Sequence, residues 1–318
     1  ESTDPYSVKI GTAMLVLGKY FRLTLFPYPM SFYYGYSYIK PTPLTAPEAF
    51  VPLIIFILLL VSSLWLASRN TLLSWAILFF LISIAVFSNL TLPIPGMLGD
   101  RFLLIPSIGF SVLLAWIIFK LLRQDTTPGI VDWKSIPKPF SAVVLALLVI
   151  YSSVTLARNS QWKDRLTLFK HDITVVDSSA QAHNLLGVHL LIASANVQVP
   201  AEQSRMREEA ATHFRQAIEI YPPFLNATYD LGRTYELLGR MDEALAAYQR
   251  TTEIDSNFVA PCFNMALYYH NKEDLDRAIP LYEKYISKYP FQKEVYANLS
   301  YAYFKKGNFA KSIETNQR

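Results

Sequence analysis

Apolar residues follow two different patterns along the chain, and the pattern changes near residue 158. The first half holds long uncharged runs, whereas the second half alternates charged and apolar residues over short intervals. A helix rises about 1.5 Å per residue, so a run of about 18 or more apolar residues nearly spans a hydrocarbon core of about 30 Å. Buried helices of a soluble protein would have shorter runs with polar faces. Four transmembrane helices are therefore predicted, at roughly Phe50–Ala67, Thr71–Leu90, Phe102–Leu122 and Pro139–Ala157.

An earlier apolar run, over residues 8–26, contains Lys19 and Arg22. A cation at the middle of a bilayer costs roughly 2.5–3.5 kcal/mol, so this run either spans with its cations reaching the headgroups or lies in the interface. Residues 27–49 follow and are rich in proline and aromatic side chains. Proline at this density excludes a regular helix. The segment is either an aromatic belt at the headgroups or a re-entrant loop that lines a lipid or substrate groove.

Basic residues in the connecting loops predict the orientation. The loops at 27–49 and 91–101 carry one cation each, Lys40 and Arg101. The other two loops carry Arg69, Lys120, Arg123, Lys134 and Lys138. Because short basic loops stay in the cytoplasm, the aromatic loop, Arg101 and everything after Arg158 are predicted to share the extracytoplasmic or lumenal side of an inner or endoplasmic-reticulum membrane.

From about residue 180 onward, a unit of 34 residues recurs. The strings DLG, NMA and NLS stand at 230–232, 264–266 and 298–300, and a related LLG stands at 185–187. Small residues and rings recur in register with them, at Ala210, Ala244 and Ala278 and at Phe214, Tyr248 and Tyr282. A helix–turn–helix unit of 34 residues is the signature of the tetratricopeptide repeat. The second half is therefore predicted to be an α-solenoid.

These patterns predict an all-α chain with three parts: a transmembrane domain over 1–157, a connector over 158–179 and repeats over 180–318. The expected repeats are 180–224, 225–258, 259–292 and a truncated 293–318. Since a solenoid needs a polar end cap, further repeats are expected in a longer parent protein.

Stacked repeats form a concave groove that suits an extended peptide or a partner's helix. Polar side chains on the first helices are the candidates for binding a peptide backbone, and simple solvation is the alternative. The candidates are Asn184, Asn226, Asp230, Asn264 and Asn298.

Composition narrows the function classes. The net charge of +4 is modest and no dense Lys/Arg block occurs, which argues against nucleic acid as a partner. The single cysteine, Cys262, excludes an internal disulfide. The five histidines lack the spacing of known zinc motifs, so no metal site is predicted.

Three local strings carry a resemblance to a known family. They are LGKYFRLTLFPYPMSFYYGY, DRFLLIPSIGF and ARNSQWKDRLTLFKHD, at residues 17–36, 100–110 and 157–172. Together with the repeats they resemble the transmembrane and tetratricopeptide repeat-containing family of O-mannosyltransferase-like proteins and its bacterial relatives. The resemblance spans essentially the whole chain, as the last membrane segments followed by the repeats.

The resemblance implies the polytopic GT-C glycosyltransferase architecture and transfer of a sugar from a polyprenyl-phosphate donor to a protein hydroxyl. Such transfer needs a carboxylate to take the acceptor proton and cationic help for the departing phosphate. No catalytic residue is assigned, because the family's principal acid is expected upstream of this chain, and the isolated piece is expected to be inactive. No cofactor is evident, and a divalent cation in the full-length protein is left open.

Asp100, Arg101 and Lys40 are the candidates for binding the donor phosphate, and Arg22 and the loop tyrosines are weaker ones. The alternative for Arg101 is a cation at the membrane surface that pairs with Asp100. The residues that follow the last apolar run are expected to meet lipid headgroups rather than substrate. They are Arg158, Asn159, Trp162 and Lys163.

Two other functions compete with this one. The first is a non-catalytic membrane-anchored scaffold whose repeats bind proteins. The second is an enzyme resembling oligosaccharyltransferases or O-antigen ligases, and the short late loops argue against it. The glycosyltransferase needs additional upstream spans, whereas the scaffold does not.

Overall fold

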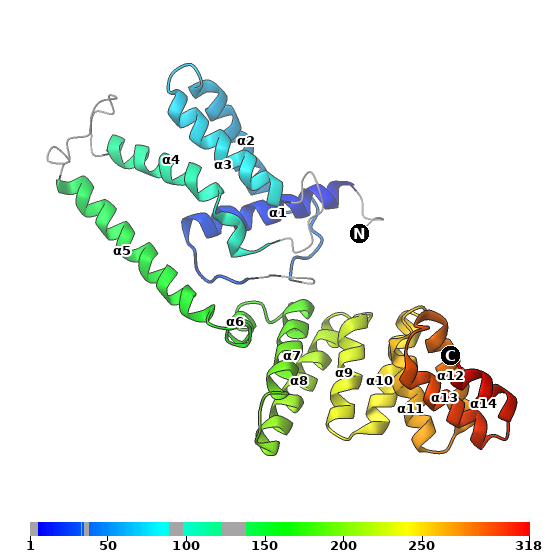
Figure 1. Ribbon diagram of the computed structural model, residues 1–318. Helices are drawn as coiled ribbons and strands as arrows, with labels where there is room; N and C mark the ends of the chain where they lie inside the picture. The colour runs from blue at the N-terminus through cyan, green and yellow to red at the C-terminus, as the bar shows by residue number, and fades with distance from the viewer. Residues whose placement is uncertain (1–5, 33, 35–37, 89–97, 122–137) are drawn as a thin grey trace. The chain divides into compact units, whose positions relative to one another are not determined.

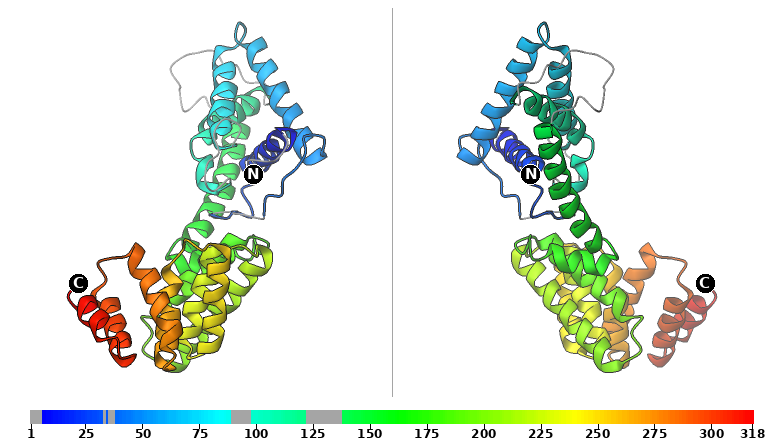
Figure 2. Two further views of the ribbon diagram at one scale, coloured as in Figure 1. Left: turned by 90° about the vertical axis from the view of Figure 1, so that its right-hand side faces the viewer. Right: turned by 90° about the vertical axis from the view of Figure 1, so that its left-hand side faces the viewer.

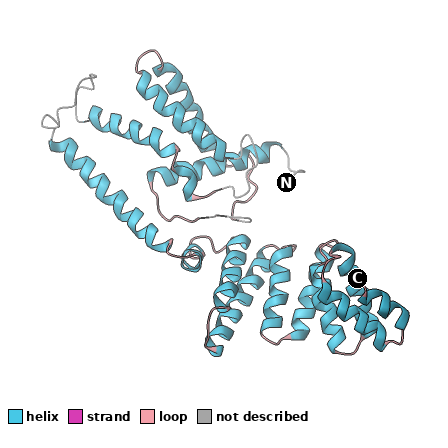
Figure 3. Cartoon of the chain, viewed as in Figure 1, coloured by secondary structure: helices cyan, strands magenta, loops and turns pink. Residues whose placement is uncertain are grey.

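The computed structural model describes residues 6–32, 34, 38–88, 98–121 and 138–318, and every regular element among them is helical (Figures 1 and 3). This confirms the all-α class. The chain divides into two compact units, residues 1–182 and residues 183–318.

The first unit contains six α-helices and one 3-10 turn among its described residues, apart from the start of α7. They are α1 (Tyr6–Leu25), α2 (Pro47–Leu66), α3 (Thr71–Phe87), η1 (Asp100–Leu103), α4 (Pro106–Leu121), α5 (Lys138–Gln161) and α6 (Arg165–Asp172). Helix α1 packs against α2, α2 against α3, and α3 against α4. The buried core centres on α1 and α3, with Leu17, Tyr20 and Ile84 almost fully enclosed.

Close helix packing in this unit depends on small residues. A Cβ atom added to Gly109 of α4 would lie 2.5 Å from the carbonyl oxygen of Ala76 in α3, which is well inside contact distance. A Cβ added to Gly18 of α1 would lie 2.4 Å from the ring of Pro52 in α2. Glycine at such points lets two helix backbones approach closely, as in membrane helix pairs.

Two of the four predicted spans have helices that are long and apolar enough to cross a membrane, among the residues described. They are α2, with 20 residues, and α5, with 24. Helices α3 and α4 are apolar but have only 17 and 16 residues. The predicted run from Phe102 is wrong at its start, because residues 100–103 form a 3-10 turn and α4 begins at Pro106, a residue that favours the first helical turn. The expected ends at Leu90 and Leu122 lie outside the described residues, as do Arg123 and Lys134.

The apolar side chains of α2 and α5 remain largely uncovered within the described unit. None of the most apolar stretch of α5 is buried, and Leu145 keeps 61% of its surface exposed. In α2 the corresponding exposed fraction of Leu64 is 64%. Monomeric soluble proteins rarely expose contiguous apolar surface of this kind, so these helices are built to contact lipid or a partner.

The second unit consists of helices that pack as successive antiparallel neighbours (Figures 1 and 2). They are α7 (Ala180–Ser194), α8 (Pro200–Ile220), α9 (Leu225–Leu237), α10 (Met241–Ile254), α11 (Ala260–Asn271), α12 (Leu275–Lys288), α13 (Lys293–Lys305) and α14 (Phe309–Asn316). Within the pairs, an added Cβ on Gly187 would meet the ring of Phe214 at 2.8 Å, and one on Gly232 would meet the ring of Tyr248 at 2.6 Å. The recurring rings Phe214 and Tyr248 therefore pack against the glycines of the LLG and DLG strings.

Three turns between paired helices repeat the same backbone conformation at intervals of 34 residues. Gly239 and Gly307 have φ values of 75° and 76°, in the left-handed region where glycine is favoured. The corresponding residue of the middle repeat is Glu273, with a φ of 59°. The repeat geometry thus imposes a glycine-like backbone on a residue that has a side chain.

Candidate functional site

The three strings that carry the family resemblance meet at one residue of the first unit, Phe32. Its backbone N–H donates a hydrogen bond to Asp172 Oδ2 at 2.6 Å. Its carbonyl oxygen accepts a hydrogen bond from Arg101 Nη1 at 3.2 Å. Phe32 belongs to the first string, Arg101 to the second and Asp172 to the third, so we name this junction the Phe32 clamp.

Asp172, the last residue of α6, is almost completely buried, with 3% of its surface exposed. Besides Phe32, it accepts a hydrogen bond from Ser31 Oγ at 3.2 Å, and its Oδ1 lies 2.8 Å from Arg158 Nη1. His171 Nδ1 lies 3.4 Å from the same oxygen. A buried carboxylate needs such partners, since an unpaired buried charge is strongly destabilising.

Arg101 contacts Phe32 through its guanidinium as well as through the hydrogen bond. The guanidinium carbon lies 4.2 Å from the centroid of the Phe32 ring and 4.7 Å from that of Phe102. Gly99 lies close to the same carbonyl, because a Cβ added to it would be 2.8 Å from Phe32 O. The segment around Arg101 is therefore fitted against the backbone of the aromatic loop.

Two aromatic side chains of the third string, in the connector, pack against the Phe32 ring. Trp162 meets it edge-on with centroids 5.4 Å apart, and Phe169 of α6 does so at 6.2 Å. Arg158 lies over the ring of Trp162, 5.7 Å from its centroid. The expectation that Arg158 meets lipid headgroups is wrong, because its side chain is buried with Asp172. Trp162 keeps 44% of its surface exposed.

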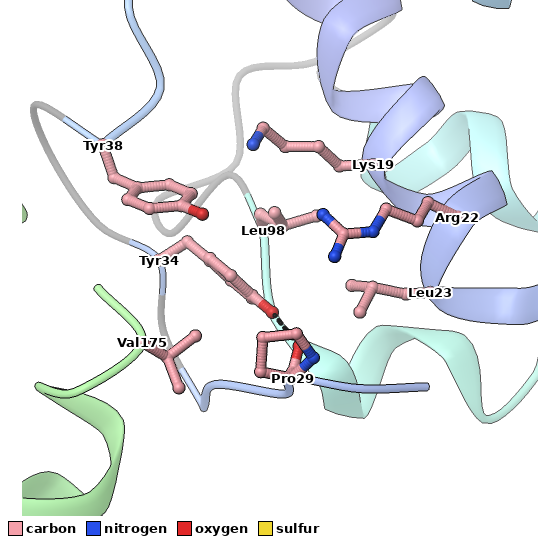
Figure 4. Close-up of a pocket in the computed structure, with 8 residues that line it drawn as sticks. All are labelled: Lys19, Arg22, Leu23, Pro29, Tyr34, Tyr38, Leu98 and Val175. Atoms are coloured by element: carbon pink, nitrogen blue, oxygen red, sulfur yellow. Dashed lines mark hydrogen bonds between the residues drawn. The ribbon is translucent and has the colours of Figure 1, made fainter. Parts of the chain in front are cut away.

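A pocket lies beside the clamp, between α1 and the aromatic loop (Figure 4). Lys19 and Arg22 extend from α1 toward Tyr34 and Tyr38, and Leu98 and Val175 complete the wall. Lys19 Nζ lies 4.7 Å from the centroid of the Tyr38 ring. The loop wall is held by Tyr34, whose hydroxyl donates to Pro29 O at 3.3 Å and whose N–H donates to Leu98 O at 3.2 Å.

The pocket has the chemistry of an anion site. Two cations three residues apart on one helix face point into it, and the described residues that line it include no carboxylate. Arginine presents planar donors that match a phosphate, and lysine adds a compact positive charge. Tyrosine hydroxyls and rings beside them suit a ligand with polar and apolar parts.

Two of the predicted donor-phosphate residues, Arg101 and Lys40, do not line this pocket. Arg101 is exposed and contacts Phe32, and Lys40 is exposed on the loop. Asp100 opens the 3-10 turn, and its side chain lies outside the described residues. Arg22, the weaker candidate, does line the pocket. Lys19 was not predicted as a ligand, and its place in an apolar run was the only sequence signal for it.

The predicted groove residues lie on first helices of the repeats but differ in their surroundings. Asn226 is exposed and Asn298 is half-buried. Asn264 donates from Nδ2 to Glu236 Oε2 at 2.9 Å, and Tyr248 donates its hydroxyl to the same oxygen at 2.7 Å. Asn264 is therefore engaged within the solenoid.

The other two groove candidates are Asn184, which is buried, and Asp230, which is half-buried. Asn184 has 7% of its surface exposed, and its Oδ1 is buried without a hydrogen-bond partner among the described residues. Asp230 is half-buried 3.5 Å from Arg233 Nη1. Burial raises the pKa of the Asp230 carboxyl, and the charge of Arg233 opposes that shift.

A divalent cation, left open at the sequence level, finds no suitable ligand set in the described part of the chain. No group of three or more His, Cys, Asp or Glu side chains there is close enough to hold a metal ion.

The fold and the sequence together define a tetratricopeptide-repeat protein with apolar helices ahead of its repeats. Tetratricopeptide-repeat family models match residues 203–260 and 263–318. The chain is 29% identical over 225 residues to mouse Protein O-mannosyl-transferase TMTC3. The matched region covers 66% of this chain and 22% of that protein. It is 31% identical over 177 residues to Drosophila melanogaster Protein O-mannosyl-transferase Tmtc3, covering 55% and 17%. The chain is TMTC-like, and it spans about a fifth of the length of these curated relatives.

Solved structures are similar to part of the chain at low identity. A crystal structure of MamA is 18% identical with a TM-score of 0.42, covering 48% of this chain and 82% of that one. YrrB, described as a TPR protein with an unusual peptide-binding site, is 20% identical with a TM-score of 0.39, covering 54% and 78%.

Proposed function

We propose that this chain is part of a membrane-embedded glycosyltransferase of the GT-C type, in which Lys19 and Arg22 bind the phosphate of a polyprenyl-phosphate sugar donor. The single observation that carries the proposal is the pocket, where two cations face two tyrosines beside the junction of the three family-like strings. The similarity to proteins named O-mannosyl-transferases supports the reaction class, with a Ser or Thr hydroxyl of a protein as acceptor.

The departing phosphate gains negative charge as the sugar leaves, so fixed cations beside it lower the barrier. Lys19 and Arg22 are held on α1, whose buried face includes Val16, Leu17 and Tyr20. A rigid helix with fixed donors is better suited to this role than a mobile surface cation. The exposed apolar surface of α2 and α5 then lies in lipid, where the polyprenyl chain of the donor also lies.

The repeats are proposed to bind the acceptor polypeptide or a partner protein. Their groove offers polar side chains of different depth, including exposed Asn226 and half-buried Asp230 and Asn298. We further propose that the aromatic loop, Arg101 and the repeats share the extracytoplasmic or lumenal compartment. The contacts of Phe32 with Arg101 and Asp172 support a common side for the aromatic loop, the Arg101 turn and the connector helix α6, which precedes the repeats in the chain.

The test is binding of a polyprenyl phosphate to the chain in lipid nanodiscs, with the matching polyprenyl alcohol as the ligand control. Replacing both Lys19 and Arg22 by Gln should weaken binding at least about tenfold, since a hydrogen bond to a charged group contributes about 1.5–3 kcal/mol. Lys9→Gln, which removes an exposed cation from the same helix, should leave the affinity unchanged.

Equal affinities for the phosphate and the alcohol, or an unaltered affinity in the double variant, would contradict the donor site. That result would favour the second candidate, a membrane-anchored scaffold in which only the repeats bind a partner. The observation behind this candidate is the repeat solenoid itself, matched by two family models.

A further inference from the structure

Asp172 has contacts that exceed what the end of a short helix needs. Its side chain accepts from the N–H of Phe32, from Ser31 Oγ and from Arg158 Nη1, and it is almost completely buried. Helix α6 is only eight residues long and already has an N-cap, Asp164, whose carboxylate accepts from Thr167 N at 2.8 Å. The buried carboxylate at the other end therefore serves the loop rather than the helix.

The loop segment that Asp172 holds is the wall of the pocket. Pro29 and Tyr34 both line the pocket, and Ser31 and Phe32 lie between them in the chain. Fixing the backbone at Phe32 from both sides, by Asp172 at the N–H and by Arg101 at the carbonyl, restricts where Pro29 and Tyr34 can lie. The distance of this wall from Lys19 and Arg22 on α1 then depends on the clamp.

We propose that Asp172 is a positioning residue of the pocket: by accepting hydrogen bonds from the Ser31 hydroxyl and the Phe32 N–H, it sets the separation between the loop wall and the cations Lys19 and Arg22. It does not touch the ligand. The role in phosphate binding rests on the function proposed above, whereas the placement of the wall does not.

The variant that tests this role is Asp172→Asn. It keeps the size of the side chain but leaves Arg158 without its counter-charge, and an amide in place of a carboxylate cannot satisfy all of the donors around it. The matched control is Asp164→Asn, which makes the same chemical change on the same helix at an exposed position, and asparagine is an equally good N-cap. A second variant, Ser31→Ala, removes one hydrogen bond to Asp172 and keeps the ion pair.

The first measurement is amide hydrogen exchange on the chain in nanodiscs, without any ligand. The N–H of Tyr34, which donates to Leu98 O, should exchange at least about tenfold faster in Asp172→Asn, less so in Ser31→Ala, and at the parent rate in Asp164→Asn. If Asp172→Asn fails to fold, Ser31→Ala still decides the question. Unchanged exchange at Tyr34 in a folded Asp172→Asn or in Ser31→Ala would overturn the proposal.

The second measurement separates positioning from general destabilisation. Affinity for polyprenyl phosphate should fall about tenfold in Asp172→Asn, as expected when the loss of a supporting contact lets a binding site loosen. This loss should become much smaller in an Arg22→Gln background, because the two residues act on the same ligand contact. A structural role alone would give the same loss in both backgrounds, and that additivity would overturn the positioning role.

The outcomes for the two proposals differ. If Arg22→Gln binds polyprenyl phosphate as well as the parent, the donor site fails, and faster exchange at Tyr34 in Asp172→Asn still supports the placement of the wall. If Arg22→Gln weakens binding while Asp172→Asn changes neither affinity nor exchange, the donor site stands and the positioning role is overturned.

Discussion

Arg158 Nη1 lies 2.8 Å from Asp172 Oδ1 in the interior of the first unit, and both side chains are less than a tenth exposed. Arg158 also donates to Gln161 Oε1 at 2.8 Å. The pair joins the end of α5 to the end of α6, and through Asp172 it reaches the aromatic loop. A single ion pair thus links the last apolar helix to the loop that borders the pocket.

Arg158→Met should destabilise the first unit by about 3–5 kcal/mol, because it leaves the Asp172 carboxylate buried without a counter-charge. The measurement is thermal unfolding of the detergent-solubilised chain. Arg165→Met, which removes an exposed cation at the start of α6, should change the unfolding temperature little. Similar unfolding temperatures for both variants would argue against a structural role for the pair.

Gly109→Leu should separate α3 from α4, since even a Cβ at this position would lie 2.5 Å from Ala76 O. Overpacking in a close contact costs about 1–3 kcal/mol or more. The control is Ala115→Leu, which adds the same side chain at an exposed position of α4. Loss of thermal stability and of amide protection in α3 for Gly109→Leu alone is the expected result, and equal behaviour of the two variants would contradict it.

Glu273→Gly should stabilise the repeats by about 0.5–1 kcal/mol. The change removes the strain of a Cβ atom in the left-handed region, and the larger backbone entropy that glycine loses on folding offsets part of this gain. Its counterpart is Gly239→Ala, which should destabilise the neighbouring repeat. An added Cβ there meets nothing within 4 Å, so the effect would come from the backbone alone. Amide exchange in α11 and α12 for the first variant, and in α9 and α10 for the second, measures the two opposite changes.

The third repeat should lose stability as the pH falls below about 6.5, the ordinary pKa of histidine. Burial lowers the pKa of His270, whose Nδ1 lies 3.3 Å from Tyr282 Oη and whose ring stacks on Tyr301. A lowered pKa means that the folded repeat binds fewer protons than the unfolded chain. The stability present at neutral pH is therefore lost as the pH falls from about 6.5 toward the lowered pKa of His270. In His270→Gln the exchange of α11 amides should depend less on pH between 7.5 and 5, and an identical pH profile would refute this assignment.

The sequence predicted the repeats well because each repeat depends on local spacing. The interval of 34 residues, the small residues such as Ala244 and the rings such as Tyr248 directly determine which helices pack together. The start of α4 was missed because Phe102 continues the apolar run, whereas Pro106 determines where the helix begins. Apolar runs indicate where lipid contact is favourable but leave helix ends to local backbone chemistry.

The pocket was harder to predict from the sequence for a physical reason. Asp172 recognises the backbone N–H of Phe32 across 140 positions, and a bond to a backbone amide places no requirement on the residue type that donates it. The strings around Arg101 and Asp172 were recognised as family-like, yet their meeting point depends on the tertiary fold. Lys19 looked like an obstacle to membrane insertion, and its proximity to Arg22 on one side of α1 became meaningful only beside Tyr34 and Tyr38.

The most direct test of the central claim is the reactivity of Lys19 toward an amine-acylating reagent in the nanodisc-embedded chain, with and without polyprenyl phosphate. Polyprenyl phosphate should slow acylation of Lys19 several-fold while Lys9 on the same helix reacts as before, and the polyprenyl alcohol should protect neither. Equal reactivity of Lys19 in the presence and absence of saturating polyprenyl phosphate would contradict binding of the donor phosphate at Lys19.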